Sequence, residues 1–193
     1  MQGLHLQEID RLSGVLERFL GFARPAAPSL GPVDLREVCV QLAGLIDAQA
    51  RRHQLEVRTR SSDHAATIRG DREQLVQAGL AIALNGLDAM AESGKGKRLT
   101  IGVEPGRRGS HHFHVVSLEN DGPSIPEDLL ERIFDPFVTT RELGSGLGLS
   151  IAARIIDAHG GWIAAANLAD GGVGFRLWVP VHADQPGQRE RTS

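Results

Sequence analysis

Apolar residues recur at helical spacing in four parts of the chain, and each pattern predicts a helix. The expected helices cover about residues 4–23, 34–52, 72–92 and 146–159. The first carries one apolar seam at spacings of three, four and three residues, as in coiled coils, formed by Ile9, Leu12, Leu16 and Phe19. Asp34 can cap the second helix, on which Val38, Leu42 and Leu45 are expected to share one face.

Shorter segments with alternating or β-branched apolar residues lie between these helices and predict strands. They are expected at about residues 55–59, 67–70, 98–104, 112–119, 162–166 and 175–180. A short helix is expected near residues 127–133, and Gly160 and Gly161 can end the last long helix, because glycine readily adopts positive φ. Helices on one face of a mixed sheet make the expected fold a two-layer α/β sandwich of the α+β kind.

Composition shifts divide the 193 residues into one main domain and three smaller parts. Residues 1–24 form the first helix, and the proline-rich residues 25–32 are typical of a stiff linker. The main domain is expected to cover residues 33–182. Residues 183–193 are polar with mixed charge, and we expect them to be disordered.

Bulk properties exclude several classes of function. A net charge of −3 argues against a dominant nucleic-acid surface, which is usually basic. No stretch approaches the roughly 18 apolar residues that span a membrane, and the N-terminus lacks the pattern of a signal peptide. Cys39 is the only cysteine, so we expect a buried, inert thiol and a cytoplasmic setting.

Three closely spaced glycines, Gly144, Gly146 and Gly148, lead directly into the last predicted helix. Glycine has no Cβ, so its backbone can turn sharply and approach a ligand closely. The first turn of a helix offers unpaired N–H groups and the positive end of the helix dipole. This combination suits a phosphate group.

Two upstream segments fit the same kind of site. The segment from Ala83 to Met90 carries Asn85 inside a helix, where asparagine is unfavourable unless its side chain has a partner. Mg²⁺ takes few protein ligands, all of them oxygen, so one side-chain carbonyl facing the phosphates suffices. The second segment, Glu119–Pro126, lies between a predicted strand and the sequence Phe134–Phe137.

The order of these motifs resembles the ATP-binding catalytic domain of bacterial sensor histidine kinases, and the resemblance covers about residues 11–181. These domains share the Bergerat-type fold of the GHKL group with chaperone, topoisomerase and mismatch-repair ATPases. The asparagine box ends in Asn85, and the first glycine box is Asn120–Pro126. The Phe box is Phe134–Phe137, and the second glycine box is Gly144–Gly148.

The resemblance implies that the chain binds ATP and holds Mg²⁺ through Asn85. It places these residues at the ATP site: Asn85, Asp88, Asn120, Asp121, Gly122, Ile125, Thr139, Thr140, Arg141, Gly144, Ser145, Gly146, Leu147, Gly148 and Leu149. Hydroxyl and guanidinium groups also suit phosphate oxygens chemically. Asp88 either orients Asn85 or a Mg²⁺-bound water, or is a solvated helix charge. Phe134 and Phe137 can form the hinge of the segment that covers ATP, or they can pack in the core. The two roles do not exclude each other.

The chain departs from the family pattern at several positions. Ala81 stands four residues before Asn85, where kinases carry asparagine and the hydrolytic ATPases carry the glutamate that activates water. Asn120 stands where an aspartate accepts the adenine amino group, although an amide carbonyl can still accept that hydrogen bond. A slip of one residue would give this role to Asp121 instead. Ser124 replaces a glycine.

The phosphate-accepting histidine of the family has no counterpart here, because no histidine stands in the expected sequence context. His5 lies in the first helix without that context, and His159 is expected to be a helix-end residue whose cationic form suits the dipole. His112 and His114 could bind a metal, but ordinary surface histidines are the simpler interpretation. The implied reaction is transfer of the γ-phosphoryl group to a histidine outside this chain, for onward transfer to the receiver domain of a response regulator.

Residues 1–24 resemble the second helix of the family's dimerisation hairpin, which implies a homodimer or pairing with a hairpin helix through the apolar seam. The alternative is a helix docked on its own domain. Two other functions stay open. One is a catalytically silent nucleotide-binding or protein-interaction module, and the other is an ATPase of the GHKL group, against which Ala81 counts.

Overall fold

The computed structural model describes residues 27–61, 65–139, 141 and 144–181. The predicted helix at 4–23, the first two residues of the linker and the tail at 183–193 lie outside the described residues, and the last two linker residues belong to strand β1 (Gly31–Asp34). Within them, five strands form one sheet in the order β2-β4-β5-β7-β6. Their bounds are β2 Glu56–Ser61, β4 Arg98–Arg108, β5 His111–Asn120, β6 Trp162–Asn167 and β7 Val173–Pro180. β2 pairs with β4 in parallel and the other neighbours are antiparallel, which confirms the mixed sheet.

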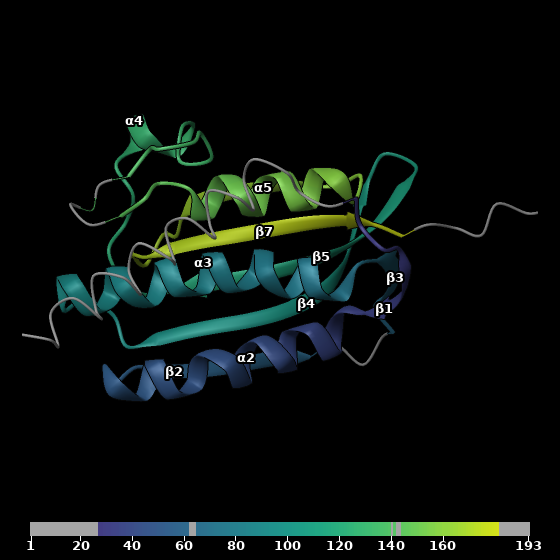
Figure 1. Ribbon diagram of the computed structural model, residues 1–193. Helices are drawn as coiled ribbons and strands as arrows, with labels where there is room; N and C mark the ends of the chain where they lie inside the picture. Colours follow the sequence, from purple (N-terminus) through teal and green to yellow (C-terminus); the bar gives the residue numbers. More distant parts are fainter. Residues whose placement is uncertain (1–26, 62–64, 140, 142–143, 182–193) are drawn as a thin grey trace, which may run out of the picture.

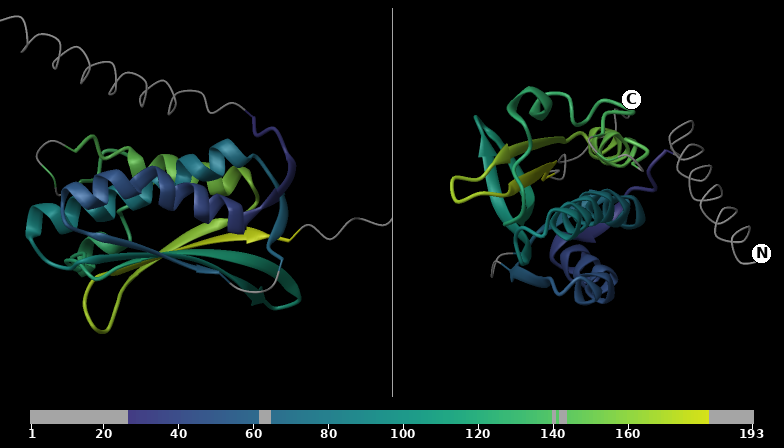
Figure 2. Two further views of the ribbon diagram at one scale, coloured as in Figure 1. Left: turned by 90° about the horizontal axis from the view of Figure 1, so that it is seen from below. Right: turned by 90° about the vertical axis from the view of Figure 1, so that its left-hand side faces the viewer.

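Three long helices cover one face of this sheet (Figures 1 and 2). They are α2 (Leu35–Arg52), α3 (Arg72–Ser93) and α5 (Gly148–Ala158), and α3 lies between the other two. The short helix α4 (Glu127–Leu130) follows β5. A second sheet of two antiparallel strands, β1 (Gly31–Asp34) and β3 (Thr67–Gly70), lies near the starts of α2 and α3. The two-layer α/β sandwich predicted from the sequence is therefore confirmed.

Helix caps fix where α2 and α3 begin. The Asp34 carboxylate accepts a hydrogen bond from the backbone N–H of Arg36 at 2.9 Å. The Asp71 carboxylate accepts two, from Glu73 at 3.1 Å and Gln74 at 3.2 Å. Such caps satisfy N–H groups that the first helical turn leaves unpaired. α3 ends at Gly94, whose φ of 66° is the left-handed conformation that glycine adopts without strain.

The prediction for one residue of α2 is wrong. Leu45 is 55% exposed, whereas Val38 and Leu42 are buried as expected. The buried stripe is centred on Leu35, Val38, Cys39, Leu42, Ile46 and Ala50. At about 100° per residue, Leu45 lies roughly a quarter turn from the middle of that stripe. Leu45 follows Leu42 by three residues, which is a spacing typical of one helix face. Which face of the helix is buried, however, depends on where the sheet lies.

Burial confirms the expectation of a buried, inert thiol at Cys39. Cys39 is 3% exposed, and burial raises the pKa of its thiol to about 12, so the thiol is unreactive at neutral pH. None of the helices in the described residues is long and apolar enough to cross a membrane.

Candidate functional site

Asn85 lies in the middle of α3 and is half-buried. Among the described residues, no group forms a hydrogen bond with its side-chain amide. An interior helix position lacks the capping role that makes asparagine favourable elsewhere. The Asn85 amide is therefore available to water or to a ligand.

The end of β5 approaches α3 directly beside Asn85. Asn120 is only 5% exposed, and a Cβ added to Gly86 would lie 3.3 Å from the Asn120 Nδ2. The Asn120 Oδ1 accepts from the backbone N–H of Gly122 at 3.1 Å, and its Nδ2 donates to the Val173 carbonyl at 3.4 Å. These two bonds fix the plane of the amide, while one N–H and one lone pair remain unused.

Gly122 is close-packed against α3. A Cβ at this position would lie 2.5 Å from the Cγ of Met90 and 3.0 Å from the Asn120 Oδ1. Any larger residue would push the segment 120–122 away from α3. Met90 thus forms part of the wall here, a role that the sequence did not single out because its apolar spacing is that of an ordinary core residue.

Asp121 points away from Asn120, as neighbouring residues of an extended segment do. Its Oδ1 accepts from the backbone N–H groups of Lys97 at 2.7 Å and Arg98 at 2.8 Å, at the start of β4. Desolvation opposes its charged form, but these backbone hydrogen bonds prevail and lower the pKa of the carboxyl group. This geometry favours Asn120 over Asp121 as the side chain that faces the site.

Ile125 is held by a side chain that sequence reasoning missed. The Asn167 Oδ1 accepts from the Ile125 N–H at 2.8 Å, and the Asn167 Nδ2 donates to the Ile125 carbonyl at 2.7 Å. Ile125 packs against the core, and Ser124 beside it is exposed. The position of Asn167 at the end of β6 was the available signal, but its partner lies 42 residues away along the chain.

The second glycine-rich segment packs onto the Phe box. Gly146 has φ of 64°, and its carbonyl accepts from the Phe137 N–H at 3.0 Å. A Cβ at Gly146 would lie 2.5 Å from the Phe137 carbonyl carbon, and one at Gly144 would lie 2.5 Å from the Thr139 Oγ1. Both glycines are needed for these close approaches.

The start of α5 lies against α3 upstream of Asn85. A Cβ at Gly148 would lie 3.9 Å from the Cβ of Ala81, so the small residue at 81 adjoins the beginning of α5. Leu147 is buried, Leu149 is half-buried, and the Ser145 hydroxyl accepts from the Leu147 N–H at 3.4 Å. The segment is thus anchored by the buried Leu147, and Gly148 lies beside α3.

Arg141 is bound to α3 through two carboxylates. Its Nη1 lies 2.7 Å from the Asp88 Oδ2, and its Nη2 lies 2.5 Å from the Glu92 Oε1. Burial opposes the charge, but the two carboxylates outweigh it and raise the pKa of Arg141. Asp88 also accepts from the Gln49 side chain of α2 at 3.2 Å. Asp88 is thus neither a solvated charge nor bonded to Asn85, and Glu92 is a partner that the sequence did not indicate.

The two phenylalanines of the Phe box differ in environment. Phe134 packs edge-on against Phe175 of β7, with ring centroids 6.4 Å apart. Phe137 is 63% exposed and has φ of 67°. The core interpretation therefore holds for Phe134. Thr139 accepts from the Arg141 N–H at 3.1 Å, and Thr140 lies outside the described residues.

The interpretation of His159 as a cation is wrong, although its place at the end of α5 is confirmed. It is 3% exposed, and its Nε2 accepts from the backbone N–H of Asp71 at 2.9 Å, which leaves no proton on that nitrogen. His5 lies outside the described residues. Across the described ranges, no cluster of three His, Cys, Asp or Glu side chains could hold a metal ion, so His112 and His114 gain no further ligand.

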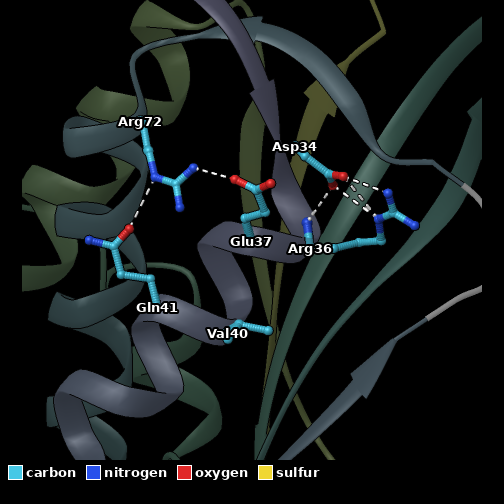
Figure 3. Close-up of a pocket in the computed structure, with 6 residues that line it drawn as sticks. All are labelled: Asp34, Arg36, Glu37, Val40, Gln41 and Arg72. Atoms are coloured by element: carbon cyan, nitrogen blue, oxygen red, sulfur yellow. Dashed lines mark hydrogen bonds and ion pairs between the residues drawn. The ribbon is translucent and has the colours of Figure 1, made fainter.

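A separate open hollow of about 660 Å³ lies at the starts of α2 and α3 (Figure 3). Its charged groups are paired with one another. Arg72 bonds to Glu37 at 2.6 Å and to Gln41 at 3.1 Å, while Arg36 bonds to Asp34. Along a helix rising 1.5 Å per residue, Arg72 is about 20 Å from Asn85. This hollow is therefore distinct from the candidate site.

Comparison with known proteins shows the family of the chain. Residues 70–183 match the family described as histidine kinase-, DNA gyrase B- and HSP90-like ATPase. The sensor histidine kinase ZraS of Salmonella typhimurium is 31% identical over 93% of this chain, which spans 37% of the length of that relative. The nucleotide-free catalytic domain of histidine kinase ThkA is 30% identical, with a TM-score of 0.67 over 79% of this chain and 95% of that one.

Two structures of longer kinases also match. Full-length ShkA in complex with AMPPNP gives a TM-score of 0.77 at 28% identity, over 92% of this chain and 38% of that one. ThkA in complex with the response regulator protein TrrA gives a TM-score of 0.72 at 28% identity, over 91% of this chain and 48% of that one. The chain belongs to the histidine kinase-, DNA gyrase B- and HSP90-like ATPase family, as an ATP-binding catalytic domain of the histidine kinase type.

Proposed function

We propose that Mg²⁺·ATP binds along α3, between the segment 120–125 and the glycine-rich segment 144–148. The observation that carries this proposal is that α3, which carries Asn85, contacts both glycine boxes. Gly86 adjoins Asn120, Met90 adjoins Gly122, and Ala81 adjoins Gly148. Motifs separated by up to 67 positions thus converge on three turns of one helix.

Each motif supplies a different kind of contact in this proposal. The unused N–H and lone pair of Asn120 face the base, and Gly122 lets the base approach closely. The glycines of 144–148 and the start of α5 receive the phosphates, together with Thr139 and Arg141. We leave Asp121 out of this set because its carboxylate is bonded to the start of β4.

The Asn85 side chain fits the chemistry of Mg²⁺. The ion needs few protein ligands, and a half-buried amide oxygen without another partner in the described residues can be one of them. When bound, Mg²⁺ would neutralise phosphate charge. The family membership and the AMPPNP complex of ShkA support ATP as the nucleotide.

We infer that the chain is the catalytic part of a longer kinase and transfers the γ-phosphoryl group to a histidine outside it. Its contribution would be to position ATP and stabilise charge, as in other phosphoryl transfers. Alanine at 81 offers no general base for hydrolysis beside Asn85. The ThkA complex supports a response regulator as the next acceptor. Pairing through Ile9, Leu12, Leu16 and Phe19, and a cytoplasmic location, remain parts of this proposal.

Calorimetric titration with a non-hydrolysable ATP analogue, with and without Mg²⁺, tests the nucleotide site. We expect binding that Mg²⁺ strengthens, and weaker binding of adenosine, which lacks the phosphates. Absence of binding at millimolar analogue would overturn the proposal and favour the silent interaction module. Steady phosphate release from ATP by the chain alone would favour the hydrolytic ATPase instead.

A further inference from the structure

Arg141 is held in a three-point contact by two acidic residues of α3. Its Nη1 contacts Asp88 at 2.7 Å, and its Nε and Nη2 contact the same Glu92 oxygen at 2.9 and 2.5 Å. The Arg141 side chain is 31% exposed, so these contacts are shielded on several sides. Guanidinium groups form their strongest hydrogen bonds with carboxylates and phosphates in such multiple contacts.

This contact lies next to the proposed phosphate and metal position. Asp88 follows Asn85 by three residues, and Glu92 follows Asp88 by four, so all three side chains share one face of α3. On the other side, the Arg141 carbonyl accepts from the Gly144 N–H at 3.1 Å, which joins Arg141 to the start of the glycine-rich segment. Arg141 therefore contacts the carboxylates of α3 through its side chain and the start of the glycine-rich segment through its backbone.

A phosphate group and the two carboxylates cannot use the same N–H groups of Arg141 at once. Three of the five N–H donors are engaged with α3, and Glu92 holds the Nε/Nη2 edge, one of the edges through which arginine binds a phosphate in a bidentate way. We propose that Glu92 and Asp88 compete with the nucleotide's phosphate groups for Arg141 and thereby lower the affinity of the domain for ATP. This inference rests on the proposed nucleotide site.

Of the two carboxylates, Glu92 is the one that releases Arg141 more readily. Its side chain is 56% exposed and can move into solvent, whereas Asp88 is 30% exposed and is also bonded to Gln49. A phosphate group that binds the Nε/Nη2 edge of Arg141 has to break the Glu92 contacts. Glu92 thus sets part of the affinity without touching the nucleotide itself, which makes it a positioning residue.

The Glu92→Gln variant separates this competition from other effects. Glutamine keeps the size and helix propensity of the side chain but removes its charge. The control is Glu104→Gln, the same charge change at an exposed position on β4. Binding of the Mg²⁺-bound ATP analogue and of adenosine is titrated for the full chain and both variants. Arg141→Ala is titrated too, with and without Glu92→Gln.

We expect Glu92→Gln to bind the analogue about two- to fivefold more tightly, the range of partly exposed ion pairs, with no change for adenosine or for Glu104→Gln. The gain should vanish in the Arg141→Ala background. A gain that persists without Arg141 would mean simple charge repulsion and would overturn the inference, as would unchanged affinity in Glu92→Gln. Failure of every chain to bind either ligand would overturn the proposed nucleotide site and this inference with it.

Discussion

The Nε2 of His159, at the end of α5, accepts a hydrogen bond from the backbone N–H of Asp71, at the start of α3. Its Nδ1 lies 2.7 Å from the Ile155 carbonyl and therefore donates to it, which fixes the neutral tautomer. One buried imidazole thus joins the end of the helix that follows the glycine-rich segment to the start of the helix that carries Asn85.

We expect His159→Ala to lower the free energy of unfolding by about 2–4 kcal/mol, because it leaves the Asp71 N–H unpaired and opens a cavity between α3 and α5. Urea unfolding measures this change. His111→Ala, at an exposed position on β5, should stay within about 0.5 kcal/mol of the parent chain. Equal stability of the two variants would mean that the His159 contact contributes nothing.

Asn85→Ala should remove the strengthening of nucleotide binding by Mg²⁺, which we expect to be roughly tenfold or more in the parent chain. Alanine is the better helix former, so the variant should be at least as stable as the parent, and any loss is then due to the missing amide. Titration of the ATP analogue with and without Mg²⁺ gives the answer. An unchanged Mg²⁺ effect would exclude Asn85 as a ligand.

Gly146→Ala should weaken binding of the ATP analogue by roughly tenfold, because the new methyl group overlaps the main chain of Phe137 and displaces the glycine-rich segment. Gly94→Ala is the matched control. Gly94 has nearly the same φ, 66° against 64°, but a Cβ there meets nothing within 4 Å. Both variants carry backbone strain of about 1–2 kcal/mol. Similar affinities for the two would contradict a role for the contact between Gly146 and Phe137.

Asp121→Asn should make the loss of folding stability at low pH smaller. The pKa of Asp121 is lowered in the folded chain, so its contribution is fully present above the unfolded-state pKa of about 3.9. That contribution is lost as the pH falls through the lowered pKa, when the carboxylate is protonated. The urea concentration at the midpoint of unfolding should therefore fall less steeply in the variant as the pH is lowered from about 7 to about 2.

Nucleotide affinity at neutral pH is the companion measurement for Asp121→Asn. We expect it to be unchanged, because the carboxylate is bonded to the start of β4. A large loss of affinity, together with an unchanged acid profile, would return Asp121 to the nucleotide site in place of Asn120.

The sequence by itself determined most elements of this fold, because their signals are local, but it did not indicate the short strand β1. Asp34 and Asp71 cap helices within three residues of themselves, and Gly94 and Gly160 end helices through their own φ. The α/β class follows from the succession of those elements. The motifs around Asn85, Asn120 and Gly146 were equally visible, since each is a short run of residues with a distinctive backbone requirement.

Only the tertiary structure decided which of these residues meet. The face of α2 that is buried depends on where the sheet lies, and this leaves Leu45 exposed. The partners of Arg141 on α3 are 53 and 49 positions away, and those of Asn167 and His159 are 42 and 88 positions away. No periodicity or cap encodes such pairs. They arise when burial of the apolar faces brings the helices and strands together, and the polar groups left at the contacts must then find partners.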